Sequence, residues 1–317
     1  MLGKGIAVDH NGVMRVFVGA DRSQQLAINV LKYSIQRHTA APIEVIPMID
    51  LPVPVPKNPR NSQRTGFSYS RFCIPKLAGY SGRAIYMDAD MQVFKDIVEL
   101  WELPFNGAKV LVQQDVKYLD VSMAKNNAPK TRIKQCAVML LDCSRLDWDI
   151  NTIVNDLDEG RYSYEQLMYE LCILKEDEVG YAVPFEWNSL EYYDENTRLI
   201  HYTDMGTQPW VSVNNPNGHL WFAEVRKMLG NGSLDWGMLE AEVRLEYFRP
   251  SLLYEIRYGH LVPKFLYPLF NHTNTILDKL KGYVPHKAVY DAKRLRAKAI
   301  KSYEHTVQPQ SSVTGSQ

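Results

Sequence analysis

The sequence of 317 residues carries no net charge, has few cysteines and contains no long apolar run. Thirty-six basic residues balance 36 acidic ones, so no overall field attracts nucleic acid. The four cysteines, Cys73, Cys136, Cys143 and Cys172, lack the spacing of a zinc site and lie in apolar stretches, which argues against a disulfide framework too. No stretch reaches the ~18 apolar residues of a membrane span, and residues 1–11 contain no basic region followed by an apolar segment. We therefore expect a cytoplasmic protein in a reducing compartment.

The apolar residues that are present indicate an α/β fold. Residues 14–20 and 43–46 are typical of buried strands, and residues 25–38 between them have helical apolar spacing. A strand, a helix and a strand in this order predict a mostly parallel sheet with helices on its faces. Further helices are expected at residues 67–77, where the helix is broken or starts near Pro75, and at residues 163–174. Further strands are expected at residues 84–87, 108–113, 137–141 and 199–202.

Two aspartates, Asp88 and Asp90, directly follow one of these apolar runs. A run without alternation is typical of a strand covered on both faces, and the carboxyl end of such a strand faces a ligand crevice. Carboxylates one residue apart can both reach a hard divalent cation there. Two other pairs with this spacing lie in polar sequence, where aspartate most often caps helices or turns: Asp147 with Asp149, and Asp156 with Asp158.

Two carboxylates leave the cage of a divalent cation incomplete. Diphosphate oxygens and one further protein group could complete it, and the best later candidate is His201. This residue lies at the end of a predicted strand, before a turn that contains Gly206. A structural histidine held by hydrogen bonds is the alternative interpretation.

Several blocks of the sequence together resemble glycosyltransferase family 8 and its bacterial relatives. They fall in order between about residues 14 and 222, at residues 65–75, 84–90, 98–101, 201–206 and 209–210. The resemblance implies a GT-A fold, in which a mostly parallel central sheet is flanked by helices. It also implies transfer of a sugar from a nucleotide-diphosphate sugar, most simply a UDP-sugar, to an acceptor hydroxyl with retention of anomeric configuration.

The resemblance also assigns roles to particular residues. Asp88, Asp90 and His201 would bind Mn²⁺ or Mg²⁺. The donor would be contacted by Asp21 at its base, by Arg71 at its ribose or phosphate, and by the backbone at Gly206. Glu165 and Gln166 stand where the family places groups near the donor sugar. Gln208 stands where many members have a lysine before the Pro-Trp pair, so a cationic contact to the leaving diphosphate is missing there or supplied elsewhere.

The acceptor is less defined, and we expect a glycan, a lipid or a small molecule. Trp187 and Asn188 could line its pocket, because an exposed tryptophan stacks on sugar faces, but Trp187 could equally be a core residue.

The C-terminal part of the chain is basic. Residues 264–301 contain nine Lys or Arg and two Asp, and residues 286–303 have the apolar spacing of an amphipathic helix. This helix either packs on the domain with a solvated basic face or contacts anionic lipid through Lys287–Lys301. We predict a catalytic domain over residues 1–250, a helical basic extension over 251–307 and a disordered tail over 308–317.

Two competing functions remain open. A relative that binds nucleotide-sugars without turnover would explain the absence of lysine at Gln208. A nucleotidyltransferase would need a glycine-rich phosphate loop after the first strand, and residues 20–25 contain no glycine.

Overall fold

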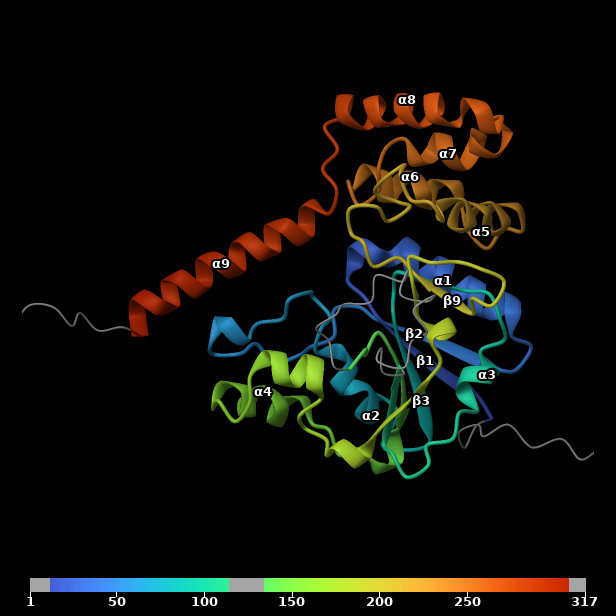
Figure 1. Ribbon diagram of the computed structural model, residues 1–317. Coiled ribbons are helices and arrows are strands. Elements are labelled where there is room, and N and C mark those ends of the chain that lie inside the picture. Colours follow the sequence, from blue (N-terminus) through green and yellow to red (C-terminus); the bar gives the residue numbers. More distant parts are fainter. Residues whose placement is uncertain (1–11, 114–133, 308–317) are drawn as a thin grey trace, which may run out of the picture.

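A central sheet of six strands forms the middle of the molecule (Figure 1). The computed structural model describes residues 12–113 and 134–307. Within them the strand order of this sheet is β2-β1-β3-β6-β5-β7. The strands are β1 (Met14–Gly19), β2 (Ile43–Met48), β3 (Arg83–Asp88), β5 (Val110–Gln113), β6 (Val138–Asp142) and β7 (Val179–Val183).

The central sheet is mostly parallel. Strand β1 runs parallel to β2 and β3, and β5 runs parallel to β7, whereas β6 is antiparallel to both of its neighbours. Helix α1 (Gln25–His38) connects β1 to β2 and has the bounds that its apolar spacing predicts. The predicted α/β class and mostly parallel sheet are therefore confirmed.

Both faces of the sheet are covered. On β1, Val16 and Val18 point to the face that packs on α1, and Phe17 points to the opposite face, where it shares a cluster with Tyr86. The second face is covered by η3 (Ser70–Cys73), α2 (Ile74–Leu77) and α4 (Ile150–Asp158), and the first by α1 and α3 (Val98–Trp101). This double cover explains why the strands are continuous apolar runs in the sequence.

A second, smaller sheet positions the end of β3. Its strands are β4 (Met91–Val93), β8 (Ser189–Leu190) and β9 (Leu199–His201), in the order β4-β9-β8. Strand β4 begins shortly after β3 ends and pairs antiparallel with β9, so that Met91 lies opposite His201. The backbone N–H of Tyr202 donates to the carbonyl of Asp90 at 2.9 Å. This pairing brings residue 201 to the carboxyl end of β3.

The helices between residues 218 and 280 form a layer beyond α1 (Figure 1). Leu252 and Ile256 share a core cluster with Trp221 and with Leu26 of α1, so the chain on either side of residue 250 packs together. The predicted domain boundaries stay a prediction.

None of the described helices is both long and apolar enough to span a bilayer. The helices of the layer beyond α1 are α5 (Gly218–Gly230), α6 (Trp236–Arg244), α7 (Leu252–Tyr258) and α8 (Tyr267–Leu280), and α9 (Lys287–Val307) follows them in the chain.

One predicted helix is shorter than expected. Within residues 163–174 the helical part covers residues 164–170, of which Gln166–Glu170 is a π-helical turn, and it ends at Leu171 in the left-handed region with φ 50°. Residues 67–77 contain η3 followed by the single turn α2, which begins at Ile74, so the predicted break or start near Pro75 is present. Helix α9 confirms the predicted C-terminal helix, while the predicted tail at 308–317 lies outside the described residues.

Candidate active site

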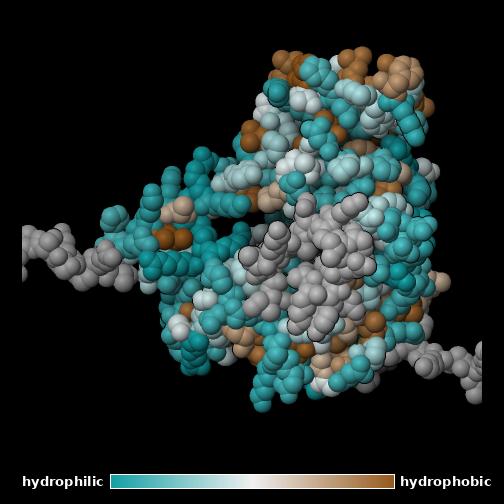
Figure 2. All heavy atoms as spheres, viewed as in Figure 1, coloured by the Kyte–Doolittle hydropathy of each residue, from teal (hydrophilic) through white to brown (hydrophobic). Residues whose placement is uncertain are grey.

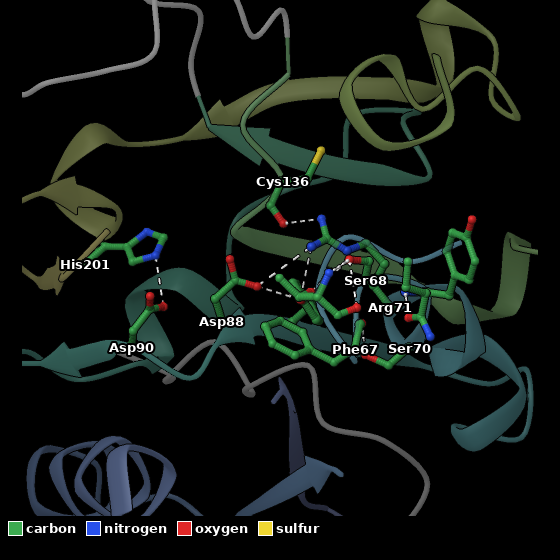
Figure 3. A network of polar contacts seen from close by, with 12 residues as sticks. Phe67, Ser68, Ser70, Arg71, Asp88, Asp90, Cys136 and His201 are labelled. Atoms are coloured by element: carbon green, nitrogen blue, oxygen red, sulfur yellow. Dashed lines mark hydrogen bonds and ion pairs between the residues drawn. The ribbon is translucent and has the colours of Figure 1, made fainter. Parts of the chain in front are cut away.

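Three side chains that the sequence predicts as metal ligands lie together. Asp88 ends β3, Asp90 follows in the turn to β4, and His201 ends β9. One ligand atom from each residue lies within 4.8 Å of the others. Figure 3 shows the His201 ring facing Asp90, with Asp88 beside them. The strand pairing of the small sheet therefore builds a cluster of two carboxylates and one imidazole.

The hydrogen bonds of His201 leave one ring nitrogen directed at this cluster. Nδ1 lies 2.9 Å from Asn188 Oδ1, and Nε2 lies 3.1 Å from Asp90 Oδ1. Asn188 donates its own amide to Gln113 Oε1 at 2.6 Å, which turns its oxygen toward the ring. The Asn188 contact favours a proton on Nδ1, which leaves Nε2 as the ring nitrogen that would bind a metal in place of its contact with Asp90.

Asp88 is held on the other side of the cluster by Tyr86 and Arg71. The Tyr86 hydroxyl donates to Asp88 Oδ1 at 2.6 Å, and Arg71 Nη2 lies 3.8 Å from the same oxygen (Figure 3). Burial raises the pKa of Asp88, and Asp90 raises it further while Arg71 opposes the shift. A cation bound between the carboxylates would relieve both causes of that raised pKa.

The imidazole responds to the same carboxylates. Burial disfavours the charged ring of His201, but the nearby carboxylates of Asp90 and Asp88 outweigh burial and raise the pKa of this histidine. The raised pKa values of Asp88 and His201 both show that the cluster favours the binding of positive charge.

A cavity of about 380 Å³ opens on this cluster. Its lining contains six of the residues that the sequence predicts for donor or metal binding: Asp21, Arg71, Asp88, Asp90, His201 and Gln208. Their individual roles stay predictions. The lining also contains residues that the sequence did not single out, among them Lys134, Tyr164, His286 and Lys293.

Gln208 and Asp21, like the other four, have contacts within the protein. Gln208 donates from Nε2 to Asp90 Oδ2 at 2.9 Å and to the carbonyl of Tyr202 at 2.7 Å. It therefore holds a ligand carboxylate with a neutral amide. Asp21 caps η1 (Arg22–Gln24), and its Oδ1 accepts the backbone N–H of Ser23 at 2.8 Å.

Three predicted residues do not line this cavity. Glu165 is exposed and forms an ion pair with Arg64 at 2.7 Å. Gln166 is also exposed, and its Oε1 accepts the backbone N–H of Ser163 at 2.8 Å. The backbone N–H of Gly206 donates to Asp204 Oδ1 at 2.9 Å. Their predicted donor contacts stay predictions.

The predicted acceptor contact of Trp187 and Asn188 is wrong in its geometry. Trp187 is 1% exposed and belongs to the core cluster under the sheet, so its ring has no open face for a sugar. Asn188 is also 1% exposed, and its amide is fully engaged by Gln113 and His201. Asn188 instead contacts Nδ1 of the predicted metal ligand His201.

Three aspartates of the two other pairs, Asp149, Asp156 and Asp158, form structural contacts, in keeping with the predicted role of these pairs. Asp149 caps α4 by accepting the backbone N–H of Thr152 at 2.9 Å. Asp156 forms an ion pair with Arg161 at 2.9 Å. Asp158 accepts the backbone N–H of Lys57 at 2.6 Å, which fixes the loop after β2.

One missed residue had a signal in the sequence, and others had none. Tyr86 precedes Asp88 by two residues on one strand, and residues at this spacing share a face, so its contact with the carboxylate could have been predicted. His286 and Lys293 reach the cavity from the last helix, and no local pattern places that helix near β3.

Solved glycosyltransferases show a distant likeness to this fold. GlyE of Streptococcus pneumoniae TIGR4 is 16% identical with a TM-score of 0.48, over 76% of this chain and 66% of that chain. An active-site mutant of LgtC is 14% identical with a TM-score of 0.48, over 67% of this chain and 95% of that one. For the bifunctional WbbM, identity is 14% and the TM-score 0.43, over 68% of this chain and 52% of that one. The chain thus spans about half the length of WbbM.

Sequence comparisons point to one family. The family model described as glycosyl transferase family 8 matches residues 25–138, which include Arg71, Asp88 and Asp90. Among curated proteins, Protein CDI of Arabidopsis thaliana is 27% identical over 223 residues, which are 63% of this chain and 80% of that protein. Over residues 25–138 the chain is therefore similar to glycosyltransferase family 8, the family that its motifs resemble.

Proposed function

We propose that this protein transfers a sugar from a nucleotide-diphosphate sugar to an acceptor hydroxyl with the help of a divalent cation. The observation that carries the proposal is the cluster of Asp88, Asp90 and His201 on a cavity of about 380 Å³. A UDP-sugar is the expected donor, and retention of the anomeric configuration the expected outcome.

The donor atoms of the cluster fit a cation of the Mn²⁺ or Mg²⁺ type. Carboxylate oxygens suit both ions, but Mg²⁺ prefers an all-oxygen shell, and the imidazole of His201 makes Mn²⁺ the better fit of the two. When bound, the ion supplies a Lewis acid for the diphosphate. Asp88, Asp90 and His201 would hold it, and Asn188 would orient the histidine.

The acceptor can attack the donor sugar on the face that the diphosphate leaves or on the opposite face. The carboxylates that line the cavity within the described residues are Asp21, Asp88 and Asp90. Asp21 caps η1 and the other two belong to the metal cluster, so none is placed as a nucleophile for the sugar. We therefore propose attack by the acceptor hydroxyl on the face that the diphosphate leaves, with Glu165 or Gln166 reaching the donor sugar only after a rearrangement of residues 163–171.

The activity is tested by incubating the protein with a panel of UDP- and GDP-sugars and Mn²⁺. We expect release of the nucleoside diphosphate from one donor, slow in water and faster with a suitable acceptor, and loss of release in EDTA. The anomeric configuration of the product, read by NMR, should match that of the donor. An inverted product would overturn the proposed face of attack, and no binding of any donor would overturn the function.

The role of the cluster is tested by Asp90→Ala. Because Asp90 provides one of the predicted ligands, this variant should lose Mn²⁺-dependent turnover by at least about a hundredfold, while its circular dichroism spectrum stays that of the unchanged protein. Asp147→Ala is the matched control, since Asp147 also belongs to an Asp-x-Asp pair but is exposed and far along the chain. Equal activity of the two variants would contradict the assignment.

The second candidate is a relative that binds nucleotide-sugars without turnover, and Gln208 favours it. This amide replaces a lysine expected by resemblance and is already engaged by Asp90. Such a protein would bind UDP with Mn²⁺ yet release none from UDP-sugars with any acceptor tried.

A further inference from the structure

The last helix reaches the cavity of the metal cluster. Residues His286, Val289 and Lys293 line that cavity together with Asp88, Asp90 and His201. Val289 and Lys293 are four residues apart and share one face of α9. His286 directly precedes the helix, with φ 51°. Figure 1 shows α9 leaving the α5–α8 layer and crossing toward α4, and Figure 2 shows an opening between this polar helix and the body of the molecule.

Contacts at both ends hold α9 across that opening. Near its start, His286 Nε2 lies 2.7 Å from the carbonyl of Met205, and Lys287 Nζ lies 2.6 Å from Glu246. Further along, Arg296 donates to the carbonyl of Arg60 at 2.7 Å. The structure therefore agrees with the packed-helix interpretation of this basic segment.

The cations that line the cavity differ in their partners. Arg64 forms an ion pair with Glu165 at 2.7 Å, and Lys134 forms one with Glu176 at 2.8 Å. Arg71 lies 3.8 Å from Asp88. The described residues offer no carboxylate within ion-pair distance of Lys293, whose contact is with the ring of Tyr290, 5.4 Å from its centroid.

Lys293 also lies where two cavities meet. A neighbouring cavity of about 610 Å³ lies under α9 and is lined by Asp21, Tyr247 and Arg296, among others. Both cavities include Lys293, Val289 and Asp21 in their lining. A ligand that extends from the metal cluster toward Asp21 would therefore occupy a cavity that this ammonium group also lines.

We propose that Lys293 binds the diphosphate of the donor and of the leaving nucleotide, and so supplies from α9 the cation that is absent at Gln208. This inference rests on the proposed function. As the acceptor oxygen bonds to the sugar carbon, the bond from that carbon to the diphosphate oxygen breaks and its electron pair stays on that oxygen. The growing negative charge is stabilised by a nearby ammonium, and the proton of the acceptor hydroxyl passes to the leaving diphosphate. Gln208, a neutral amide bonded to Asp90, does not offer that charge.

His286 does not provide a second charge from α9. Burial lowers the pKa of His286, and the carbonyl of Met205 and the carboxylates of Asp90 and Asp21 only partly oppose that shift. The ring is therefore neutral at neutral pH, and its Nε2–H donates to Met205. This leaves Lys293 as the cation of α9 that lines the metal cavity within the described residues.

The test compares a diphosphate with a monophosphate in the full-length chain. Titration calorimetry with Mn²⁺ measures UDP and UMP binding to Lys293→Ala, to Lys293→Arg and to the unchanged protein. Because a charge-assisted contact to phosphate is lost, UDP affinity should fall about tenfold in Lys293→Ala, whereas UMP affinity should change little. Lys293→Arg should retain most of the UDP affinity, since it keeps the charge.

Lys298→Ala is the matched control, because Lys298 lies on α9 and lines neither cavity. It should bind UDP like the unchanged protein. An unchanged UDP affinity in Lys293→Ala would overturn the inference alone, and so would an equal loss for UDP and UMP, which would indicate a displaced helix. If the unchanged protein binds neither nucleotide, the proposed function itself fails.

Discussion

Asn188 shows how one buried side chain can set the state of a metal ligand. Its amide donates to Gln113 and its oxygen faces Nδ1 of His201, at 2.6 and 2.9 Å. Since Nδ1 then carries the proton, Nε2 is free for the cation between Asp88 and Asp90. The residue never touches the donor in this scheme, and it acts by positioning the imidazole.

Replacing Asn188 should therefore weaken metal binding. We expect Asn188→Ala to lower Mn²⁺ affinity about tenfold, because the ring loses the contact that fixes its orientation and its proton. Asn188→Asp should restore most of this affinity, since a carboxylate accepts from Nδ1–H and Gln113 can present its amide nitrogen instead. Mn²⁺ titration followed by calorimetry measures both. Equal losses in the two variants would indicate a packing role only.

The sequence predicts the metal ligands better than their supports. Asp88 and Asp90 stand out because an apolar strand precedes them, and His201 because the family motif includes it. The role of Asn188 could not be predicted, because it depends on the burial of residues 187–188 and on Gln113 in a distant strand. An isolated tryptophan next to a polar residue looks the same in a core and in an acceptor pocket.

At the scale of elements, the role of an Asp-x-Asp pair depends on whether the pair adjoins a strand or a helix. Asp88 ends a strand and Asp149 begins helix α4, where its Oδ1 accepts the backbone N–H of Thr152 at 2.9 Å. This bond favours the ionised carboxylate and lowers the pKa of Asp149. Because the pKa is lower in the folded state, the ionised carboxylate stabilises the fold at pH values above the ordinary aspartate pKa of 3.8. This stabilisation is lost as the pH falls through the folded-state pKa.

We expect Asp149→Ala to lower the free energy of unfolding by about 1 kcal/mol at pH 7. The difference from the unchanged protein should shrink on acidification, because both chains then lack a charged cap. Urea unfolding at several pH values measures it. Asp147→Ala is the control, since Asp147 is exposed and should leave stability unchanged. A difference that stays constant with pH would show that the charge of Asp149 is not what stabilises the helix.

Elements with strong local periodicity are predicted well, and their neighbours are not. Helix α1 has the predicted bounds because its apolar face packs directly on the sheet. Residues 163–174 also have helical spacing, and Leu167, Met168 and Leu171 are buried, but Leu171 turns the backbone into the left-handed region. Helix α9 is predicted as a helix, yet its place beside Arg60 depends on a contact between residues 236 positions apart.

At the scale of the whole molecule, a buried ionic cluster joins the C-terminal helices to the region that carries the site. The Arg249 side chain is fully buried and donates to Ser251 Oγ at 2.5 Å and to Glu255 at 3.3 Å. Ser251 donates from its backbone and its hydroxyl to Asp278 of α8, at 2.7 Å each. The backbone N–H of Arg249 donates to the carbonyl of Trp210 at 3.0 Å.

Removing the arginine should destabilise the entire described chain. We expect Arg249→Ala to lower the free energy of unfolding by about 3 kcal/mol, because Glu255 is left buried without its ionic partner. Denaturant unfolding followed by circular dichroism and by tryptophan fluorescence should give one shared transition. The exposed Arg244→Ala variant is the control. Two separate transitions, with only one shifted, would instead support independent folding of residues 251–307.

The small sheet has a consequence for the order in which the site assembles. Asp90 and His201 are 111 residues apart in the chain, and the pairing of β4 with β9 brings them together. A cation held by both would act as a reversible cross-link that closes this long loop, and its binding energy would add to the stability of three short strands. The small sheet would then be most stable with the cation bound, and metal-free chains would unfold first at that sheet.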